Sequence, residues 1–422
     1  MKYTHIKQFW KQLRQNRFFT FLSLFGVAIP MMIIMLMILK VELFIHPGGP
    51  EKNNDQMLFL NRSKVKSDNG ESWGGLNLGI LENYFSQVAP SGSMAFSRLT
   101  GTTFFLNNET MDAVLRYTNA DFWKVYDFPF LEGRGFTGKN LRDKDNVVVI
   151  SRYLSRKLLG KDSGVGETLE IDGETYRIIG VVKNVTSLAR NTYAHAWLPY
   201  TLKREVPVSE QEIASSTGAY SVAFRATEQW GFEQIRKDVE RIRTKLNRIS
   251  SENTSLIFGG PADATDIYFR GIRDPEVYEG KMWNYLAIAG KALMILFLPA
   301  LNLVSLNMTR IQERSHEIAI RKAFGGTRRQ MAWQIMLENS LLTILGGMIG
   351  LLLAYGVAHA FREQVFSEFF ILHADHVKIQ MNYLVFLIVI LVSLLFSILS
   401  GLIPSWRISR LKPAYVLKGG EL

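Results

Sequence analysis

The sequence of 422 residues contains no cysteine. This absence excludes disulfides, iron–sulfur clusters, thiolate zinc sites and cysteine nucleophiles together. The sequence also lacks the HExxH pattern of zinc proteases and the GxSxG elbow of serine hydrolases. Carboxylates are plentiful, but no pair is distinguished by its spacing. We therefore predict no catalytic site, no metal site and no cofactor, so the chain is not expected to be an enzyme.

Acidic residues are fewer than basic ones: 38 acidic side chains stand against 49 basic ones, which gives a net charge of +11. The sequence contains no RNA- or DNA-binding signature. Its basic residues cluster beside apolar runs, as they do in membrane proteins. We therefore expect membrane lipid as a partner and no nucleic acid.

Four long apolar runs dominate the hydropathy pattern. The first, residues 18–39, has 22 residues without a charge, which at ~1.5 Å per residue span a hydrocarbon core of roughly 30 Å. A cleaved signal peptide is the rival interpretation, but the run is too long and residues 40–50 offer no small-x-small cleavage site. We predict an uncleaved first membrane helix.

The other three runs predict membrane helices at 284–308, 337–360 and 381–403. Gly346 and Gly350 form a GxxxG pair within the third helix. This pattern lets two helix backbones approach closely, so we expect a helix-packing contact there.

The distribution of basic residues supports four spans. Five basic residues lie in 1–17, six in 309–336 and four in the tail 404–422, whereas the loop 361–380 has two against three acids. By the positive-inside rule, the first three segments are cytoplasmic and the loop is outside. Both termini are therefore predicted to be cytoplasmic.

Residues 1–17 are predicted to form an amphipathic helix at the cytoplasmic membrane surface. Ile6, Phe9, Trp10 and Leu13 repeat at helical spacing, with lysine and arginine on the other faces. The alternative is a plain positive flank that only orients the first span.

Residues 40–283 contain no membrane-length apolar run and are predicted to form an extracytoplasmic α+β domain, inserted between the first two membrane helices. The stretch 186–230 is the least recognisable part of this segment, and its fold stays open. A strand is predicted over 145–150, followed by a helix that Ser151 starts and Gly160 ends. A hairpin is predicted over 168–182, with its turn at Asp172-Gly173. An amphipathic helix is predicted over 232–246, with four apolar residues on one face: Ile235, Val239, Ile242 and Leu246.

Two stretches come close to ligand-binding motifs. Residues 133–140 have the G-x4-G-K spacing of a phosphate-binding loop, but Asn140 stands where serine or threonine would hold Mg²⁺. The predicted outside location also separates this stretch from cytoplasmic ATP. In the outer loop, His373, Asp375 and His376 have a spacing that suits a metal ion, but a solvated loop explains them without a ligand. We predict no ligand at either stretch.

The cytoplasmic segment 309–336 is predicted to contain a helix of its own. Glu317 and Arg321 stand four residues apart in the favourable order on a charged stripe. Apolar residues lie on other sides of the same helix: Ile311, Ile318, Ile320 and Phe324.

The same segment carries signals that end one helix and start another. Gly325 and Gly326 are suited to end the first helix, and Thr327 with Gln330 forms a capping box that opens the next. Ordinary short connections need no such caps. We therefore favour a rigid charged elbow, suited to docking a protein, over a solvated linker.

The stretch EIAIRKAFGGTRRQM (317–331) resembles the coupling segment of ABC-transporter permeases of the FtsX/MacB type. That segment has an acidic residue, a short apolar stretch, Arg-Lys-Ala, an apolar residue, Gly-Ala and basic residues; here Gly326 replaces the usual alanine. Residues 117–137, with Asp-Phe, an aromatic cluster and Leu-Glu-Gly-Arg, are similar to the MacB-type periplasmic domain. Residues 146–185 follow the helix–hairpin order of that domain.

The resemblance implies an α-helical membrane protein of the bacterial inner membrane, with four transmembrane helices and a MacB-type periplasmic domain. It implies a separate ABC ATPase subunit and a second permease subunit, identical or paralogous; a periplasmic adaptor and an outer-membrane channel accompany efflux members. It also implies roles for the elbow residues: polar contacts with the ATPase by Glu317, Arg321 and Lys322, groove filling by Ile318, Ile320 and Phe324, and a tight turn at Gly325 and Gly326.

The function implied by the resemblance is transmission of ATP-driven motion to the extracytoplasmic domain, for export or extraction of a substrate. Antibiotics, peptides, lipoproteins and lipids are all open as substrates. The first alternative is a complex of the same kind that gates or signals to an extracytoplasmic partner, such as a cell-wall hydrolase, without transport. The second is an unrelated membrane-anchored receptor or enzyme.

Overall fold

The computed structural model describes residues 17–68, 70–106, 109–203, 209–250, 253–258, 260–270 and 327–361, with scattered further residues between 286 and 398. The chain divides into two compact units: residues 1–40, 286–365 and 379–422 form one, and residues 41–285 and 366–378 form the other. All described strands belong to the second unit. The predicted amphipathic helix at 1–17 lies, apart from Arg17, outside the described residues.

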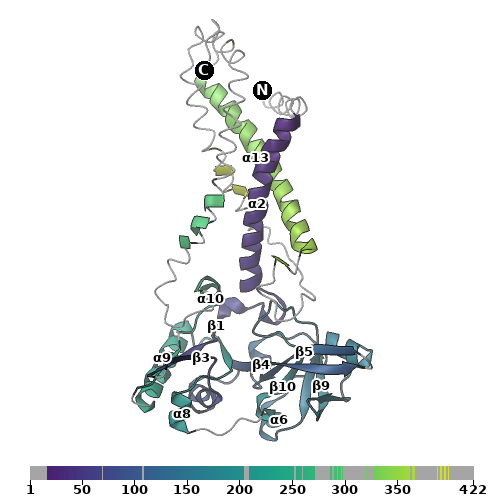
Figure 1. Ribbon diagram of the computed structural model, residues 1–422, viewed down its shortest axis with the longest axis vertical. Helices are drawn as coiled ribbons and strands as arrows, with labels where there is room; N and C mark the ends of the chain where they lie inside the picture. Colours follow the sequence, from purple (N-terminus) through teal and green to yellow (C-terminus); the bar gives the residue numbers. More distant parts are fainter. Residues whose placement is uncertain are drawn as a thin grey trace. The chain divides into compact units, whose positions relative to one another are not determined.

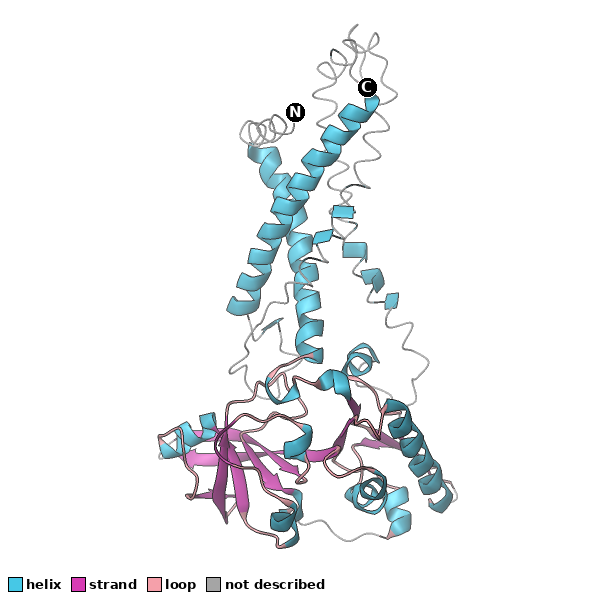
Figure 2. Cartoon of the chain, turned by 180° about the vertical axis from the view of Figure 1, so that it is seen from behind, coloured by secondary structure: helices cyan, strands magenta, loops and turns pink. Residues whose placement is uncertain are grey.

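Two long apolar helices form most of the described part of the first unit (Figure 1 and Figure 2). They are α2 (Arg17–Ile45) and α13 (Arg328–Ala360). Each contains a stretch long and apolar enough to cross a membrane, Thr20–Ile45 and Ser340–Ala360. Both helices expose large apolar side chains, as a surface facing lipid or other membrane helices requires.

The other two predicted spans, 284–308 and 381–403, lie largely outside the described residues. The residues described within them, such as Leu293 and Leu391, are helical. The structure thus describes two of the four predicted spans as continuous helices, and the count of four stays a prediction.

The second unit is built on a nine-stranded mixed sheet (Figure 2). Its strand order is β1-β11-β4-β5-β10-β7-β9-β6, and β8 also pairs with β9. β10 is parallel to β5 but antiparallel to β7. The strands are β1 (Met57–Leu60), β4 (Met94–Leu106), β5 (Glu109–Thr118), β6 (Phe130–Gly133), β7 (Val147–Ser151), β8 (Thr168–Ile171), β9 (Glu174–Val182), β10 (Ala196–Pro199) and β11 (Ser221–Arg225).

A three-stranded sheet, the 18-residue helix α9 (Phe232–Ile249) and several short helices complete this unit. The sheet has the order β12-β2-β3, with β2 (Ser63–Ser67), β3 (Gly70–Gly74) and β12 (Ser255–Phe258). The helices and helical turns are η1 (Gly49–Glu51), η2 (Asn54–Gln56), α3 (Leu78–Ile80), η3 (Leu81–Phe85), α4 (Ser86–Val88), α5 (Phe122–Val125), α6 (Gly138–Arg142), α7 (Arg152–Leu159), η4 (Tyr200–Leu202), α8 (Glu210–Ala214), α9 (Phe232–Ile249) and α10 (Ala264–Arg270). Mixed strands and short helices make this an α+β fold.

The elements predicted from local patterns in this unit are confirmed. The Ser151 hydroxyl accepts a hydrogen bond from the Leu154 N–H at the start of α7, and Gly160 ends that helix with a φ of 70°. Asp172 and Gly173 join β8 to β9 with φ angles of 51° and 81°, the left-handed pair that a two-residue type I′ turn requires. Each of these signals is complete within a few residues of sequence.

The amphipathic helix α9 closes one of the three apolar clusters of the unit. Its buried stripe packs into a cluster that includes side chains of β1, β11 and β12, such as Leu58, Phe224 and Phe258. A second cluster is rich in aromatic rings, with Phe128 and Trp197 5.3 Å apart between centroids. The third contains residues of β5, β7, β9 and β10.

Residues 186–230, the stretch whose fold the sequence left open, supply two interior strands of the large sheet. β10 joins β5 to β7, and β11 joins β1 to β4. Both strands are buried on both faces over most of their length, so neither shows the alternation of apolar and polar residues that marks a half-buried strand. The continuity of the sheet therefore depends on its least recognisable segment.

Candidate functional site

The two membrane-length helices approach each other closely at the glycines of α13. A Cβ atom added to Gly350 would lie 2.7 Å from the Ala28 carbonyl oxygen and 2.9 Å from Met31 Cβ. At Gly346, an added Cβ would lie 2.7 Å from Val27 Cγ1. The GxxxG pair thus lies on the face of α13 that packs on α2, and the contact depends on the missing side chains.

Apolar packing surrounds this glycine contact. Val27, Met31, Ile34 and Ala354 are almost fully buried in one cluster, and partly buried side chains of both helices join them. α2 and α13 are therefore a packed pair rather than two independent helices.

We call residues 317–327, the part of the predicted elbow that precedes α13, the docking segment; it is described only in part. Ile320 is helical and 46% exposed. Thr327 immediately precedes α13, which begins ahead of the span predicted at 337–360. The remaining predicted docking residues lie outside the described residues: Glu317, Ile318, Arg321, Lys322, Phe324, Gly325 and Gly326. α13 thus runs without a break from the end of the docking segment into the contact with α2.

A buried carboxylate organises the chain that follows α2. Glu51 lies in η1 and is 1% exposed. Its Oε1 accepts hydrogen bonds from the Asn191 N–H at 2.9 Å, the Thr192 N–H at 2.8 Å and the Thr192 hydroxyl at 2.8 Å. Its Oε2 accepts from the side-chain amides of Asn191 at 3.2 Å and Asn54 at 3.4 Å. Five donors therefore satisfy this carboxylate, as burial of a charge requires.

Arg116 on β5 binds the same loop and is 2% exposed. Its guanidinium donates to the Tyr193 carbonyl at 3.1 Å from Nε and 3.0 Å from Nη2. It also donates to the Arg190 carbonyl at 2.8 Å and to the Ser97 hydroxyl at 2.8 Å. We call the set Glu51, Asn54, Arg116, Asn191 and Thr192 the Glu51 network.

Burial and electrostatics oppose each other in the Glu51 network. Burial raises the pKa of Glu51, whereas the hydrogen bonds from Thr192 and Asn54 and the charge of Arg116 lower it. Burial lowers the pKa of Arg116 to about 10, while Tyr126 and Glu51 act in the opposite direction. Arg116 is thus charged at neutral pH, and its charge partly offsets the cost of burying the carboxylate.

The Glu51 network reaches the end of α2 through Asn54. The Asn54 amide donates to the carbonyl of Ile45, the last residue of α2, at 3.1 Å. Nearby, Asn53 donates to Asp127 at 2.9 Å, and Lys52 forms an ion pair with the same carboxylate at 3.2 Å. The chain leaving α2 is therefore held at several points within the second unit.

The Glu51 network has no counterpart among the features predicted from the sequence. Glu51 lies in a Gly-Pro-containing stretch that has the composition of a plain connection. Arg116 is the one residue whose sequence context indicates a buried charge, because it follows the apolar run Ala113–Leu115 and precedes an aromatic residue. A charged residue inside a strand buried on both faces needs a partner, but the sequence does not say which one.

Residues 133–140, with the spacing of a phosphate loop, have a structural explanation. Thr137 and Asn140 form the capping box that starts α6. Asn140 accepts a hydrogen bond from the Thr137 N–H at 2.8 Å and donates to Asp145 at 2.8 Å. Asn140 is thus engaged in starting a helix of five residues rather than in holding a ligand.

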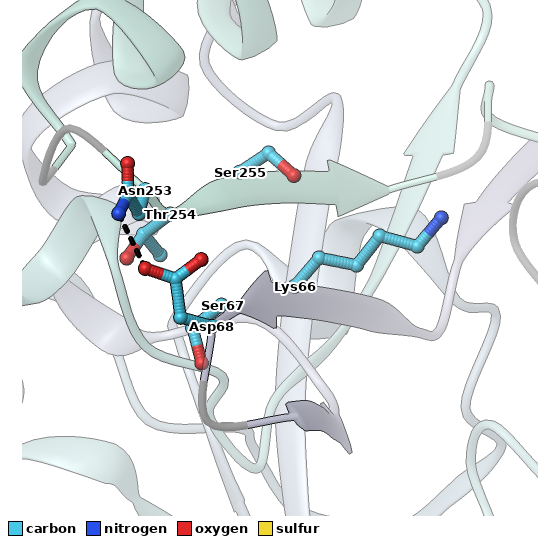
Figure 3. Close-up of a pocket in the computed structure, with 6 residues that line it drawn as sticks. All are labelled: Lys66, Ser67, Asp68, Asn253, Thr254 and Ser255. Carbon is cyan, nitrogen blue, oxygen red and sulfur yellow. Dashed lines mark hydrogen bonds between the residues drawn. The ribbon is translucent and has the colours of Figure 1, made fainter.

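A pocket of about 310 Å³ lies where β2 ends and β12 begins (Figure 3). Asn253 donates to Asp68 at its edge, and Lys66 points away from that carboxylate. The lining therefore brings no acid–base pair together. Across the described residues, no group of three or more histidine, aspartate or glutamate side chains could hold a metal ion. His373 and His376 of the outer loop lie outside them.

Comparisons with known proteins match both parts of the chain. Residues 20–242 match the MacB-like periplasmic core domain, and residues 291–413 match the FtsX-like permease C-terminal family. An uncharacterized ABC transporter permease of Bacillus subtilis, YknZ, is 25% identical over 257 residues, which cover 60% of this chain and 59% of YknZ. The macrolide export ATP-binding/permease protein MacB 2 of Aeromonas hydrophila is 22% identical over 416 residues, which cover 95% of this chain and 58% of that protein.

The chain spans about half the length of the curated relatives it matches. Among solved structures, the periplasmic region of MacB from Actinobacillus actinomycetemcomitans has 14% identity and a TM-score of 0.33, covering 47% of this chain and 88% of its own. The two family matches lie on the two parts of the chain that the sequence distinguishes. The chain belongs to the ABC-transporter permeases that combine a MacB-like periplasmic core domain with an FtsX-like permease region.

Proposed function

We propose that this chain transmits the ATP-driven motion of a separate ATPase subunit to its extracytoplasmic domain, for export or extraction of a substrate. Membership of the permease family supports the transport role. Relatives named for macrolide export favour export over the gating of an extracytoplasmic hydrolase. In this proposal, the chain supplies the movement and its partner hydrolyses ATP.

The observation that carries the proposal is the glycine contact between α2 and α13. α13 starts at Arg328, directly after the docking segment, and packs on α2 at Gly346 and Gly350. Because the interior of a protein is close-packed, a displacement of α13 at this contact must shift α2 as well. α2 in turn continues without a break to Ile45, past the division at residue 40.

The proposal assigns partners and a location to the chain. Two ATPase subunits pair with two permease subunits in a two-fold complex. The protein crosses the bacterial inner membrane four times, with both termini in the cytoplasm. A periplasmic adaptor and an outer-membrane channel are further partners on the outer side. The docking residues bind the ATPase, with polar contacts at Glu317, Arg321 and Lys322.

A pull-down tests the proposal. The tagged chain is extracted in mild detergent, co-purifying proteins are identified, and ATP hydrolysis is assayed. We expect a stoichiometric ATPase with Walker motifs. Arg321→Glu should reduce the retained ATPase at least about tenfold, because disrupting a hydrogen-bonded charge pair in an interface costs about 2–5 kcal/mol. Gly325→Pro should act similarly by removing the tight turn.

Arg248→Glu is the matched charge reversal, because Arg248 is exposed on α9 of the second unit. It should leave ATPase binding unchanged. Absence of an ATPase in several detergents, or full activity of the Gly325→Pro complex, would count against the proposed function.

A further inference from the structure

The loop at residues 190–193 is held from two neighbouring strands and from the chain that leaves α2. Arg116 on β5 and Trp197 on β10 are register partners in the parallel pair. Arg116 donates to two carbonyls of this loop, and Trp197 Nε1 donates to the Thr192 carbonyl at 3.1 Å. Glu51 binds the same loop by four hydrogen bonds. The loop therefore joins η1 to the centre of the large sheet.

The stability of the fold alone does not explain why a carboxylate is buried at Glu51. Burying a carboxylate costs free energy, and well-packed apolar residues of the same volume often stabilise a fold as well or better. Hydrogen bonds, in contrast, are directional. The five donors on Glu51 stand at 2.8–3.4 Å and come from three residues, Asn54, Asn191 and Thr192. Such a set fixes the orientation of the joined segments as well as their separation.

We infer that Glu51 is a positioning residue that locks the chain leaving α2 to the large sheet, so that the end of α2 and the sheet move as one body. The connection runs from the Ile45 carbonyl through Asn54 and Glu51 to Thr192, and from there to Trp197 and β10. The source of the movement rests on the proposed function. The rigidity itself is a property of this chain alone.

Pulsed electron resonance on the full chain in lipid nanodiscs tests this inference. Because the chain has no cysteine, Val41→Cys in α2 and Glu170→Cys on β8 give the only two spin-label sites. We expect one narrow distance distribution in the parent protein. Glu51→Ala should broaden it. Glu51→Gln should broaden it less than Glu51→Ala, because the amide keeps the oxygen that accepts three hydrogen bonds but replaces Oε2, the acceptor of the Asn54 and Asn191 side-chain amides.

Two further variants keep the test decisive if Glu51→Ala does not fold. Thr192→Val removes the hydroxyl donor, and Asn54→Ala removes the link to the end of α2; each should broaden the distribution. Asp162→Ala removes a carboxylate from a surface ion pair and is the matched control, which should stay narrow. A broad distribution in the parent protein, or narrow ones in the folded Glu51, Thr192 and Asn54 variants, would overturn the inference.

The measurement also separates this inference from the proposed function. It needs neither ATP nor a partner, so failure to capture an ATPase overturns the proposed function and leaves the rigidity test intact. In the assembled complex, Glu51→Ala should keep ATP hydrolysis near the parent rate but lower export about tenfold, a split that simple instability does not produce. Export at the parent rate by the Glu51→Ala complex would contradict the positioning role.

Discussion

Arg116 and Asp162 illustrate two different uses of charge in the second unit. Arg116 is buried, and its donors bind backbone carbonyls and one hydroxyl within the fold. Asp162 is on the surface, where Arg152 at 2.7 Å and Arg156 bind its carboxylate. These hydrogen bonds hold the pKa of Asp162 well below its usual value. The buried charge orients chain segments, whereas the surface pair adds a small stability term that depends on pH.

The surface pair leads to a prediction about acid stability. An unfolded aspartate has a pKa of about 3.9, and the pKa of Asp162 is lower in the folded chain. The contribution of the Asp162 carboxylate to the free energy of unfolding is therefore present above about pH 4. It is lost as the pH falls through the pKa that Asp162 has in the folded chain. We expect Asp162→Asn to lower the unfolding temperature slightly at neutral pH, with the difference shrinking in acid. Thermal scans at several pH values measure this, and a difference independent of pH would refute it.

At the scale of helices, α13 carries glycines in two different environments. Gly350 faces α2, where the Ala28 carbonyl oxygen leaves no room for a Cβ atom. Gly356, six residues further along the same helix, is exposed, and no described atom lies within 4 Å of an added Cβ. The same substitution therefore has opposite consequences at the two positions.

We predict that Gly350→Ala destabilises the chain by about 1–3 kcal/mol, because the added methyl group overpacks the helix contact. Gly356→Ala should be neutral or stabilising by up to about 1 kcal/mol, because alanine is the better helix former. Thermal unfolding of both variants in detergent measures the difference. Equal effects at the two glycines would mean that the α2–α13 contact is not tight.

The sequence predicts those elements whose signals are local. The turn at Asp172-Gly173, the caps of α7 and the stripe of α9 each lie within one short segment, so they could be identified without knowing the fold. β10 and β11 could not, because their stability comes from neighbouring strands rather than from their own pattern. The role of Glu51 could not be predicted for the same reason, because its hydrogen-bond partner Thr192 is 141 residues away in the sequence.

At the scale of the whole molecule, the predicted topology places the second unit outside the cytoplasm and the docking segment inside. Basic residues flank the apolar runs on the predicted inner side. The start of α13 and the exposed face of α9 should therefore lie on opposite sides of the membrane.

Single cysteines test this topology, because the chain has none of its own. Arg241 on α9 is 73% exposed, and Thr327 at the start of α13 is also exposed. We expect a membrane-impermeant maleimide to label Arg241→Cys in spheroplasts, and Thr327→Cys only after lysis. Equal labelling of both variants before lysis, or the reverse order, would disprove the predicted orientation.

The order of strands in the large sheet also has a consequence for biogenesis. β1 pairs with β11, and β10 fills the place between β5 and β7. If the unit crosses the membrane from its N-terminal end, β1 and β4 cross before β11. Their partner strand lies more than a hundred residues later in the sequence. Until Arg225 has emerged, β1 and β4 present open edges that can pair with other chains. The risk of aggregation is therefore greatest during translocation, before the last interior strand is in place.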